Sequence, residues 1–453
     1  MRWRRVMWAV ITGVMLSAGL VRAESRLPDL RVDDVGFGQA WLRSTRGQLN
    51  ERIDPFCIDL LETWLSRLRS HVDLGPLPLT ALCLSNSAFN AFAAPGGIIA
   101  VNRGVYSALA TEAELMAVLA HEIAHLSLKH HLRGLRQQEG LSPARLAMLA
   151  GLFAAIATEQ GAAAQSLIMG GQAAELQNQL AYSREFEREA DRVGVIALAD
   201  AGYRPEAMIS VLRYLAEQQA RGRTDLAFLS THPLGIERQS ELEGRLSGLT
   251  TTGRDETILS SVGFAVYRCL QTEGVEQSIL RTQLDCTEIW AVLKAYRNKQ
   301  FDEALTRWMA APKEIRHTLP GLDLTVALAL ATRDEPLVQA TLDEFELYYP
   351  DWVMLEIVKL ELASWQSDPE VPRSFRAQLI ARPDRLDAWR ALARFAETTG
   401  QAHLLLEARA WDLMLHGQLK AAEGQLREAK RVWPAALETR PLERLETALK
   451  QLQ

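Results

Sequence analysis

Hydrophobic positions divide the chain into three stretches of different character. Residues 6–20 form an apolar run behind a basic N-terminus. Residues 24–248 mix helical periodicity, as at 115–120, with short alternating segments such as the predicted strand at 80–85. From about residue 249 onward, nearly every segment is an amphipathic helix pattern rich in Ala, Leu, Arg and Glu. This order predicts a leader, an α+β domain and an all-α domain.

The N-terminal run has the composition of a secretory signal peptide. Basic residues at 1–5 precede the apolar run at 6–20, and Val-Arg-Ala at 21–23 supplies a small-residue cleavage site. A spanning helix needs about 20 apolar residues, so the run is short for a membrane anchor, which is the alternative. We expect cleavage after Ala23 and export to the bacterial periplasm.

The net charge limits the kinds of partner that the protein can bind, and the cysteine content bears on its compartment. The chain has a net charge of −6, and the predicted leader contains four Arg and no acid, so its removal leaves about −10. This acidic balance argues against nucleic acid as a partner. Two disulfides, Cys57 with Cys83 and Cys269 with Cys286, are compatible with an oxidising compartment, and buried thiols are the alternative.

The apolar run at 115–120 leads into the sequence HEIAH at 121–125. Residues four apart share one helical face, so the imidazoles of His121 and His125 can reach one metal ion. Glu122 is offset by one position, where it can hold a metal-bound water without being a ligand. Zinc lowers the pKa of such a water towards ~7, and a neighbouring carboxylate can take its proton during attack on a peptide carbonyl.

A third ligand is needed, because catalytic zinc usually takes three protein ligands and leaves one position open. A second predicted helix at 183–199 offers Glu187 and Asp191 on one face. We expect Glu187 to be the third ligand and Asp191 to accept the outer N–H of a zinc-bound histidine. Taken alone, this segment also fits a solvated helix face with pairs of opposite charges.

These motifs together resemble the gluzincin metallopeptidases that include HtpX, Oma1 and the CAAX prenyl proteases. HEIAH is followed by ExxAD at 187–191, while NAFAAPGG at 90–97 is similar to the family's NAF-x-x-PGG segment. His-Pro at 232–233, followed by Arg238, is similar to its HP-x4-R segment. The resemblance covers roughly residues 28–248 and implies a zinc-dependent endopeptidase with one zinc ion per chain.

The segment at 90–101 predicts a β-hairpin with its turn at 95–97. An edge strand beside the zinc could bind an extended peptide through main-chain hydrogen bonds. An ordinary hairpin, in which Asn90 only stabilises a turn, is the alternative. The residues expected to shape the substrate cleft are Asn90, Ala91, Phe92, Gly96 and Gly97.

His232 precedes a proline in a predicted loop. The resemblance implies that it lies over the zinc and acts in catalysis. It either stabilises the oxyanion or fills the open coordination position and holds the enzyme off. Arg238 is expected to support this site through the loop. His130 matches a common family position, but we expect it to pack at a helix end without a catalytic role.

An Ala-rich segment at 144–171 lies between the two parts of the predicted zinc site. Arg145, Glu159, Gln160 and Gln165 interrupt it too often for a membrane span. It is expected to dock near the cleft, to touch a bilayer surface, or to form a helical hairpin packed on its own domain.

Degenerate repeats follow a polar Thr/Gly segment at 249–255. Similar turns at 349–352 and 382–385 are 33 residues apart, and helix-turn-helix patterns recur at 295–304 and 417–422. Periods near 34 indicate tetratricopeptide-like units, which stack into a solenoid with a concave surface for partners. A generic helical bundle is the alternative.

The predicted protein is mainly α. An α+β HExxH gluzincin metallopeptidase domain with a small β-sheet is followed by an all-α tetratricopeptide-like solenoid. The predicted parts are a signal peptide at 1–23, the zinc metallopeptidase domain at 24–248, a linker with first helices at 249–286, and the helical repeat domain at 287–453.

This combination resembles the BepA-type periplasmic proteases. The resemblance implies quality control of outer-membrane proteins, by promoting their assembly or degrading stalled ones. It also implies contact with the outer-membrane assembly machinery through the repeats. The alternatives are a chaperone or scaffold whose peptidase site is normally shut and, with less support, an interaction protein at the inner membrane that uses residues 144–171.

Overall fold

The computed structural model describes most of the chain in eight stretches. These are residues 33–136, 184–223, 226–246, 257–273, 282–365, 371–435, 437 and 439–452. The predicted signal peptide at 1–23, the segment at 144–171 and the Thr/Gly segment at 249–255 lie outside the described residues.

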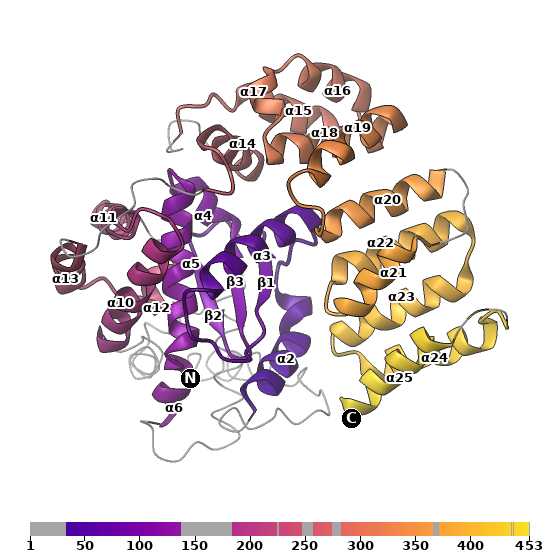
Figure 1. Ribbon diagram of the computed structural model, residues 1–453, viewed down its shortest axis with the longest axis horizontal. Helices are drawn as coiled ribbons and strands as arrows, with labels where there is room; N and C mark the ends of the chain where they lie inside the picture. The colour runs from indigo at the N-terminus through magenta and orange to yellow at the C-terminus, as the bar shows by residue number, and fades with distance from the viewer. Residues whose placement is uncertain are drawn as a thin grey trace, which may run out of the picture.

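The N-terminal half places helices around one small sheet (Figure 1). Its helices up to the HEIAH segment and just beyond are α2 (Asp34–Thr45), α3 (Pro55–Arg69), α4 (Arg103–Ala108), α5 (Glu112–Ser127) and α6 (His130–Arg136). The later ones are α10 (Arg184–Asp200), α11 (Glu206–Ala220), α12 (Phe228–Thr231) and α13 (Ile236–Leu246). The strands are β1 (Thr80–Leu84), β2 (Ala91–Ala94) and β3 (Ile98–Asn102). The predicted α+β class is confirmed.

The three strands form a sheet in the order β1-β3-β2. The predicted hairpin is the antiparallel pair β2 and β3, and β1 joins β3 in parallel. The hairpin turns at Gly96 and Gly97, whose φ values of 78° and 80° lie in the left-handed region that glycine tolerates. A Cβ on Gly97 would also lie 1.7 Å from the carbonyl oxygen of Pro78. Glycine is therefore required in this turn by the backbone conformation and by the close packing of Gly97 against Pro78.

Both faces of the sheet are covered, so the molecule is layered around it. Ala91 and Ala93 belong to the core that includes α3 and α5, whereas Phe92 and Ala94 belong to a second core formed with α2. Alternate strand residues point to opposite faces. The edge strand β2 therefore lies beside α5, which carries the HEIAH segment.

Helix α5 is anchored at its start and buried along its length. Thr111 caps it by accepting a hydrogen bond from the backbone N–H of Glu114, and every residue from Glu112 to Leu126 is buried. Helix α10 packs closely against it at Gly194, where a Cβ would lie 3.0 Å from the carbonyl oxygen of Ala120. This close approach brings α10 next to the first histidine of α5.

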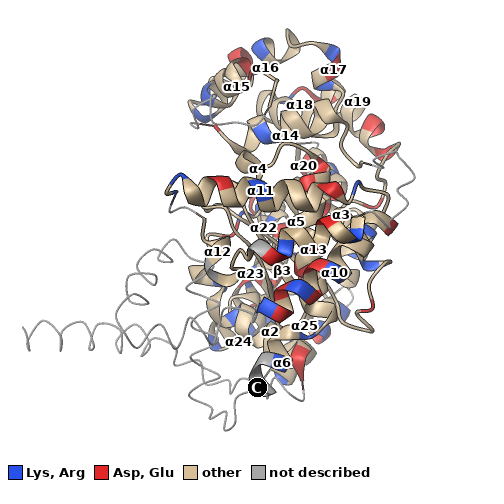
Figure 2. Ribbon diagram, turned by 90° about the vertical axis from the view of Figure 1, so that its left-hand side faces the viewer, with Lys and Arg blue, Asp and Glu red and all other residues tan. Residues whose placement is uncertain are grey.

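The outer helices of this half are joined by charged pairs. The ribbon of α10 and α13 carries both blue (Lys, Arg) and red (Asp, Glu) positions (Figure 2). Arg192 of α10 pairs with Glu241 of α13 at 2.5 Å, and Arg213 of α11 pairs with Glu243 of α13 at 2.7 Å. These contacts hold α13, and the loop before it, against α10.

All described elements after residue 257 are helices, as predicted. They are α14 (Ser261–Gln271), α15 (Thr287–Arg297), α16 (Phe301–Met309), α17 (Lys313–Arg316), α18 (Leu319–Thr332), α19 (Glu335–Glu346), α20 (Val353–Trp365), α21 (Arg373–Ala381), α22 (Leu386–Thr399), α23 (Ala402–Leu415), α24 (Leu419–Val432) and α25 (Arg440–Gln451). Helices α20 to α25 form a curved array beside α2 and α3 (Figure 1).

The hydrophobic core crosses the predicted boundary at residue 248. Tyr267 of α14, Phe345 of α19 and Leu355 of α20 share one cluster with Phe56 and Trp64 of α3. Most of the apolar contacts among α20 to α25 form a separate cluster. Helices α14, α18 and α19 therefore share the core of the N-terminal half, and α15 and α16 pack with α14 and α18 in a small separate cluster. The last helices have a core of their own.

Two disulfides link segments that are close in sequence. Cys57 of α3 bonds to Cys83 of β1, and Cys269 at the end of α14 bonds to Cys286 just before α15. These are the two pairs named as compatible with an oxidising compartment, and the alternative of buried thiols is wrong. Among the described helices, none combines the length and apolar composition that crossing a membrane requires.

Candidate metal centre

Four buried side chains from three parts of the fold meet beside the sheet. His121 and His125 come from α5, Glu187 from α10, and His232 from the residue after α12. One nitrogen or carboxylate oxygen of each lies within 4.8 Å of those of the others, and none of the four residues is more than 4% exposed. The predicted ligands are therefore brought together, with His232 among them.

The distances show how closely these atoms converge. His121 Nε2 lies 3.0 Å from His125 Nε2, and each of these nitrogens is 3.4 Å from an oxygen of Glu187. His232 Nδ1 lies 3.2 Å from His121 Nε2 and 3.1 Å from Glu187 Oε1. Imidazole nitrogens and one carboxylate are the ligand types of catalytic zinc sites. The arrangement therefore fits one divalent metal ion.

A second layer of charged groups holds these side chains in place. Asp191 Oδ1 lies 3.0 Å from His121 Nδ1, on the side of the ring opposite the centre. Arg238 pairs with Asp191 at 2.7 and 2.8 Å and with Glu187 Oε2 at 2.8 Å. It also donates to the carbonyl oxygen of Pro233, next to His232. Arg238 thus contacts both carboxylates and the loop that carries His232.

The charges of the centre favour a carboxylate ligand. Burial raises the pKa of Glu187, but the charge of His232 and hydrogen bonds from the other two histidines outweigh it and hold the pKa well below its usual range. Burial lowers the pKa of His121, but hydrogen bonds to Asp191 and Glu187 raise it to about 10. Burial holds the pKa of His125 well below its usual value.

Glu122 lies at the border between the centre and the sheet. Its Oε2 accepts a hydrogen bond from the backbone N–H of Ala93 at 2.9 Å. Its Oε1 lies 3.4 Å from His232 Nε2 and has no hydrogen-bond partner among the described residues. Burial raises the pKa of Glu122. One oxygen is therefore anchored to the strand, and the other faces His232 of the cluster.

The hydrogen bond from Ala93 N to Glu122 shows which backbone groups of β2 face the centre. Asn102 N donates to Asn90 O on the β3 side, so alternate positions of β2 bond to β3. Ala91 and Ala93 point their backbone groups to the other edge, where Ala93 N reaches Glu122.

The remaining predicted substrate residues have different surroundings. Asn90 is fully buried just before β2, and the Phe92 side chain lies in the core on the α2 face. Gly96 donates to Asp34 of α2 at 2.9 Å, and Gly97 packs against Pro78. The described contacts of these residues are thus with the sheet, with helix α2 and with Pro78. Their predicted role in the substrate cleft rests on the family motif.

His130 contacts His125 of the centre and Glu189 contacts His130, although neither contact was expected from the sequence. Lys129, with φ at 53°, ends α5 in the left-handed conformation and turns His130 back toward His125. His130 Nδ1 lies 2.9 Å from His125 Nδ1, and His130 Nε2 lies 3.1 Å from Glu189 Oε2. Burial lowers the pKa of His130 to about 4, although Glu189 raises it. The match of His130 to a common family position was the available signal.

Two histidines one helical turn apart, a carboxylate from a second helix and a glutamate beside them define a metallopeptidase of the HExxH class. Residues 61–246 match the profile of Peptidase family M48. Over these residues the chain is similar to Peptidase family M48, and its site is that of a metalloprotease.

The relatives include bacterial and mitochondrial proteases. The chain is 27% identical over 440 residues to the "Beta-barrel assembly-enhancing protease" of Yersinia pestis, covering 91% of this chain and 88% of that protein. It is 34% identical over 211 residues to a "Putative beta-barrel assembly-enhancing protease" of Vibrio cholerae, covering 46% of this chain and 43% of that protein. The "Mitochondrial metalloendopeptidase OMA1" of Arabidopsis thaliana is 28% identical over 161 residues, which are 36% of this chain and 30% of that protein.

Proposed function

We propose that this chain is a zinc-dependent endopeptidase of the periplasm that acts in the assembly and quality control of outer-membrane proteins. The observation that carries the enzymatic part is the convergence of His121, His125 and Glu187 within hydrogen-bond range of one another, with Glu122 beside them. The relatives named as β-barrel assembly-enhancing proteases support the biological part.

His121, His125 and Glu187 would hold the zinc. When bound, zinc polarises a peptide carbonyl and makes a neighbouring water more acidic. Glu122 Oε1 takes a proton from the attacking water as the new C–O bond forms. It then gives this proton to the nitrogen of the leaving amine as the C–N bond breaks. The hydrogen bond from Ala93 N to Oε2 holds the carboxylate in position for both transfers.

The outward edge of β2 would bind the substrate. An extended peptide would add a strand to this edge through the backbone N–H and C=O of Ala91 and the C=O of Ala93, while the Ala93 N–H stays bonded to Glu122. Its scissile bond would then lie next to Glu122, because Ala93 N already contacts that carboxylate. Unfolded outer-membrane proteins consist largely of strand-forming segments, so they suit this mode of binding.

His232 would regulate access to the zinc. Its Nδ1 lies as close to His121 and Glu187 as a fourth ligand would. We propose that it occupies the open position in the resting enzyme and moves away when substrate binds. This arrangement also favours the second candidate function, a chaperone or scaffold whose peptidase site is shut most of the time.

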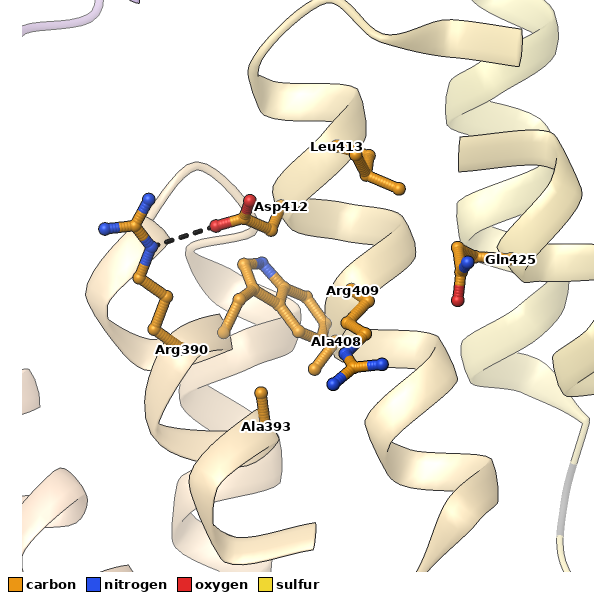
Figure 3. Close-up of a pocket in the computed structure, with 8 residues that line it drawn as sticks. Arg390, Ala393, Ala408, Arg409, Asp412, Leu413 and Gln425 are labelled. Carbon is orange, nitrogen blue, oxygen red and sulfur yellow. Dashed lines mark hydrogen bonds and ion pairs between the residues drawn. The ribbon is translucent and has the colours of Figure 1, made fainter. Parts of the chain in front are cut away.

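The helical array would bind partners or client segments as a tetratricopeptide-like solenoid. A pocket between α22, α23 and α24 offers an apolar wall with charged neighbours (Figure 3). Trp389 stacks on Trp411 at 4.9 Å beside this pocket, and Arg390 pairs with Asp412 at 2.9 Å. The residues lining it are Trp389, Arg390, Ala393, Ala408, Arg409, Asp412, Leu413 and Gln425. Such a surface suits an apolar side chain of an extended segment.

Cleavage of casein tests the enzymatic part. We expect the zinc-loaded chain to cleave casein and Glu122→Gln to bind zinc equally well but not to cleave, both in the parent and in a His232→Ala background. Glu217→Gln, on the exposed face of α11, is the matched control and should keep full activity. Equal cleavage by Glu122→Gln and the parent would overturn the hydrolytic role.

Crosslinking tests the biological part. The Glu122→Gln variant should bind substrate proteins without cleaving them. Crosslinking in the periplasm of intact bacterial cells is therefore expected to capture outer-membrane proteins on this variant. Capture of only soluble periplasmic proteins would contradict the proposed clients, while leaving the peptidase assignment intact.

A further inference from the structure

We propose that Glu189 and His130 form a positioning relay that orients the metal ligand His125. Neither residue is one of the four clustered side chains of the candidate metal centre, and both act on that centre through His125. The inference rests on the proposed function, because it assigns these residues a part in zinc binding.

The two nitrogens of His125 have different partners. Nε2 faces the centre, 3.0 Å from His121 Nε2 and 3.4 Å from Glu187 Oε1. Nδ1 faces away from the centre and lies 2.9 Å from His130 Nδ1. A neutral imidazole that gives one lone pair to a metal carries its proton on the other nitrogen, and that N–H needs an acceptor. His130 Nδ1 is the atom at the acceptor position.

The contact of His130 with Glu189 determines which nitrogen of His130 accepts a hydrogen bond. Glu189 Oε2 lies 3.1 Å from His130 Nε2, and an ionised carboxylate can only accept a hydrogen bond. Nε2 therefore carries the proton, which leaves Nδ1 as the acceptor. Arg133 pairs with both oxygens of Glu189, with Nη2 to Oε1 at 3.1 Å, and holds the carboxylate in this orientation.

Packing fixes the ring of His130 in the plane that this relay needs. Phe186 stacks on it with ring centroids 4.5 Å apart and an interplanar angle of 4°. The guanidinium carbon of Arg133 lies 4.6 Å from the centroid of the Phe186 ring. His130 itself is fully buried. A buried, stacked imidazole has little freedom to turn away from His125.

The relay on His125 parallels the support of His121. Asp191 accepts from His121 Nδ1 and is held by Arg238, whereas Glu189 acts on His125 through His130 and is held by Arg133. Each histidine ligand thus has an acceptor on its outer nitrogen, and each supporting carboxylate is paired with an arginine. Such outer partners raise the basicity of a ligand and fix its orientation.

Zinc affinity of His130→Phe tests the relay. Phenylalanine keeps the flat ring against Phe186 but offers no acceptor to His125. We expect the zinc dissociation constant, measured by chelator competition, to rise about 10- to 100-fold. The melting temperature of the metal-free protein should stay near that of the parent. His131→Phe is the matched control, because His131 faces Asp34, and its zinc affinity should match that of the parent.

A pair of variants at Glu189 gives a second test, and decides the matter if His130→Phe does not fold. Glu189→Gln keeps an oxygen that can accept from His130 Nε2, and Glu189→Ala does not. We expect Glu189→Ala to weaken zinc binding several-fold and Glu189→Gln to bind more tightly than Glu189→Ala. Parent-like zinc affinity in both His130→Phe and Glu189→Ala would overturn the relay. Failure of the parent itself to bind zinc would instead overturn the proposed function.

Discussion

His232 Nδ1 lies 3.2 Å from His121 Nε2, inside the ring of atoms that would hold the metal. The two rings come from distant parts of the chain, and both are almost completely buried. Arg238 holds the His232 loop by donating to the carbonyl oxygen of Pro233. Under the proposal made above, this is a closed arrangement, in which His232 would fill the fourth position of the centre.

Replacing His232 tests whether this arrangement restrains the enzyme. If the ring occupies the open position, His232→Ala should raise the rate of casein cleavage on the order of tenfold, because a larger share of molecules has an accessible site. Zinc content, measured in parallel, should stay at the parental level. A fall in cleavage with zinc retained would favour the alternative role, stabilisation of the oxyanion.

Zinc binding should release a proton from His121. Burial lowers the pKa of His121, but Asp191 and Glu187 raise it to about 10, so the ring is protonated at neutral pH before metal binds. A metal ligand must give up that proton. We expect the zinc dissociation constant to fall about tenfold for each unit of rising pH between roughly 6 and 9. Calorimetry in buffers of different ionisation enthalpy measures the released proton, and an affinity independent of pH would contradict the account.

A buried charge cluster joins the helical array to the N-terminal half. Arg385, just before α22, pairs with Asp59 of α3 at 2.6 Å and with Asp387 at 2.6 Å, and all three are nearly inaccessible. Removing one partner of such a cluster leaves buried charge without compensation. Arg385→Met is expected to lower the free energy of unfolding by about 3–5 kcal/mol.

The matched control for Arg385 is Arg390→Met. Arg390 pairs with Asp412 within the array, and its side chain is 42% exposed. Exposed pairs contribute little, so the free energy of unfolding should change by less than about 1 kcal/mol. Urea denaturation measures both variants. Equal losses in the two would show that the Arg385 cluster does not stabilise the contact between the two halves.

Helical spacing, together with the family motifs, indicated which residues come together at the candidate metal centre. His121 and His125 share a face because they are four residues apart in a helix, and Glu187 and Asp191 repeat that spacing on α10. The position of His130 was not predictable in the same way. Its contact with His125 depends on the left-handed turn at Lys129, and nothing in the periodicity of the segment indicates that conformation.

Long-range packing was the other part that sequence did not reveal. The hairpin of β2 and β3 follows from its turn, whereas the parallel pairing of β1 with β3 depends on contacts made across the sheet. The composition change near residue 249 suggested a separate helical domain. Apolar helix faces do not indicate their partners, so the shared core of Phe345 with Phe56 became visible only in the fold.

Zinc stoichiometry tests the central claim most directly. Native mass spectrometry of the intact chain and of two variants, Glu187→Ala and Glu189→Ala, at saturating zinc separates a ligand from its neighbour two residues away. The account predicts one zinc per chain for the parent and for Glu189→Ala, and none for Glu187→Ala. Loss of zinc from Glu189→Ala alone, with Glu187→Ala still loaded, would contradict the assignment of the centre.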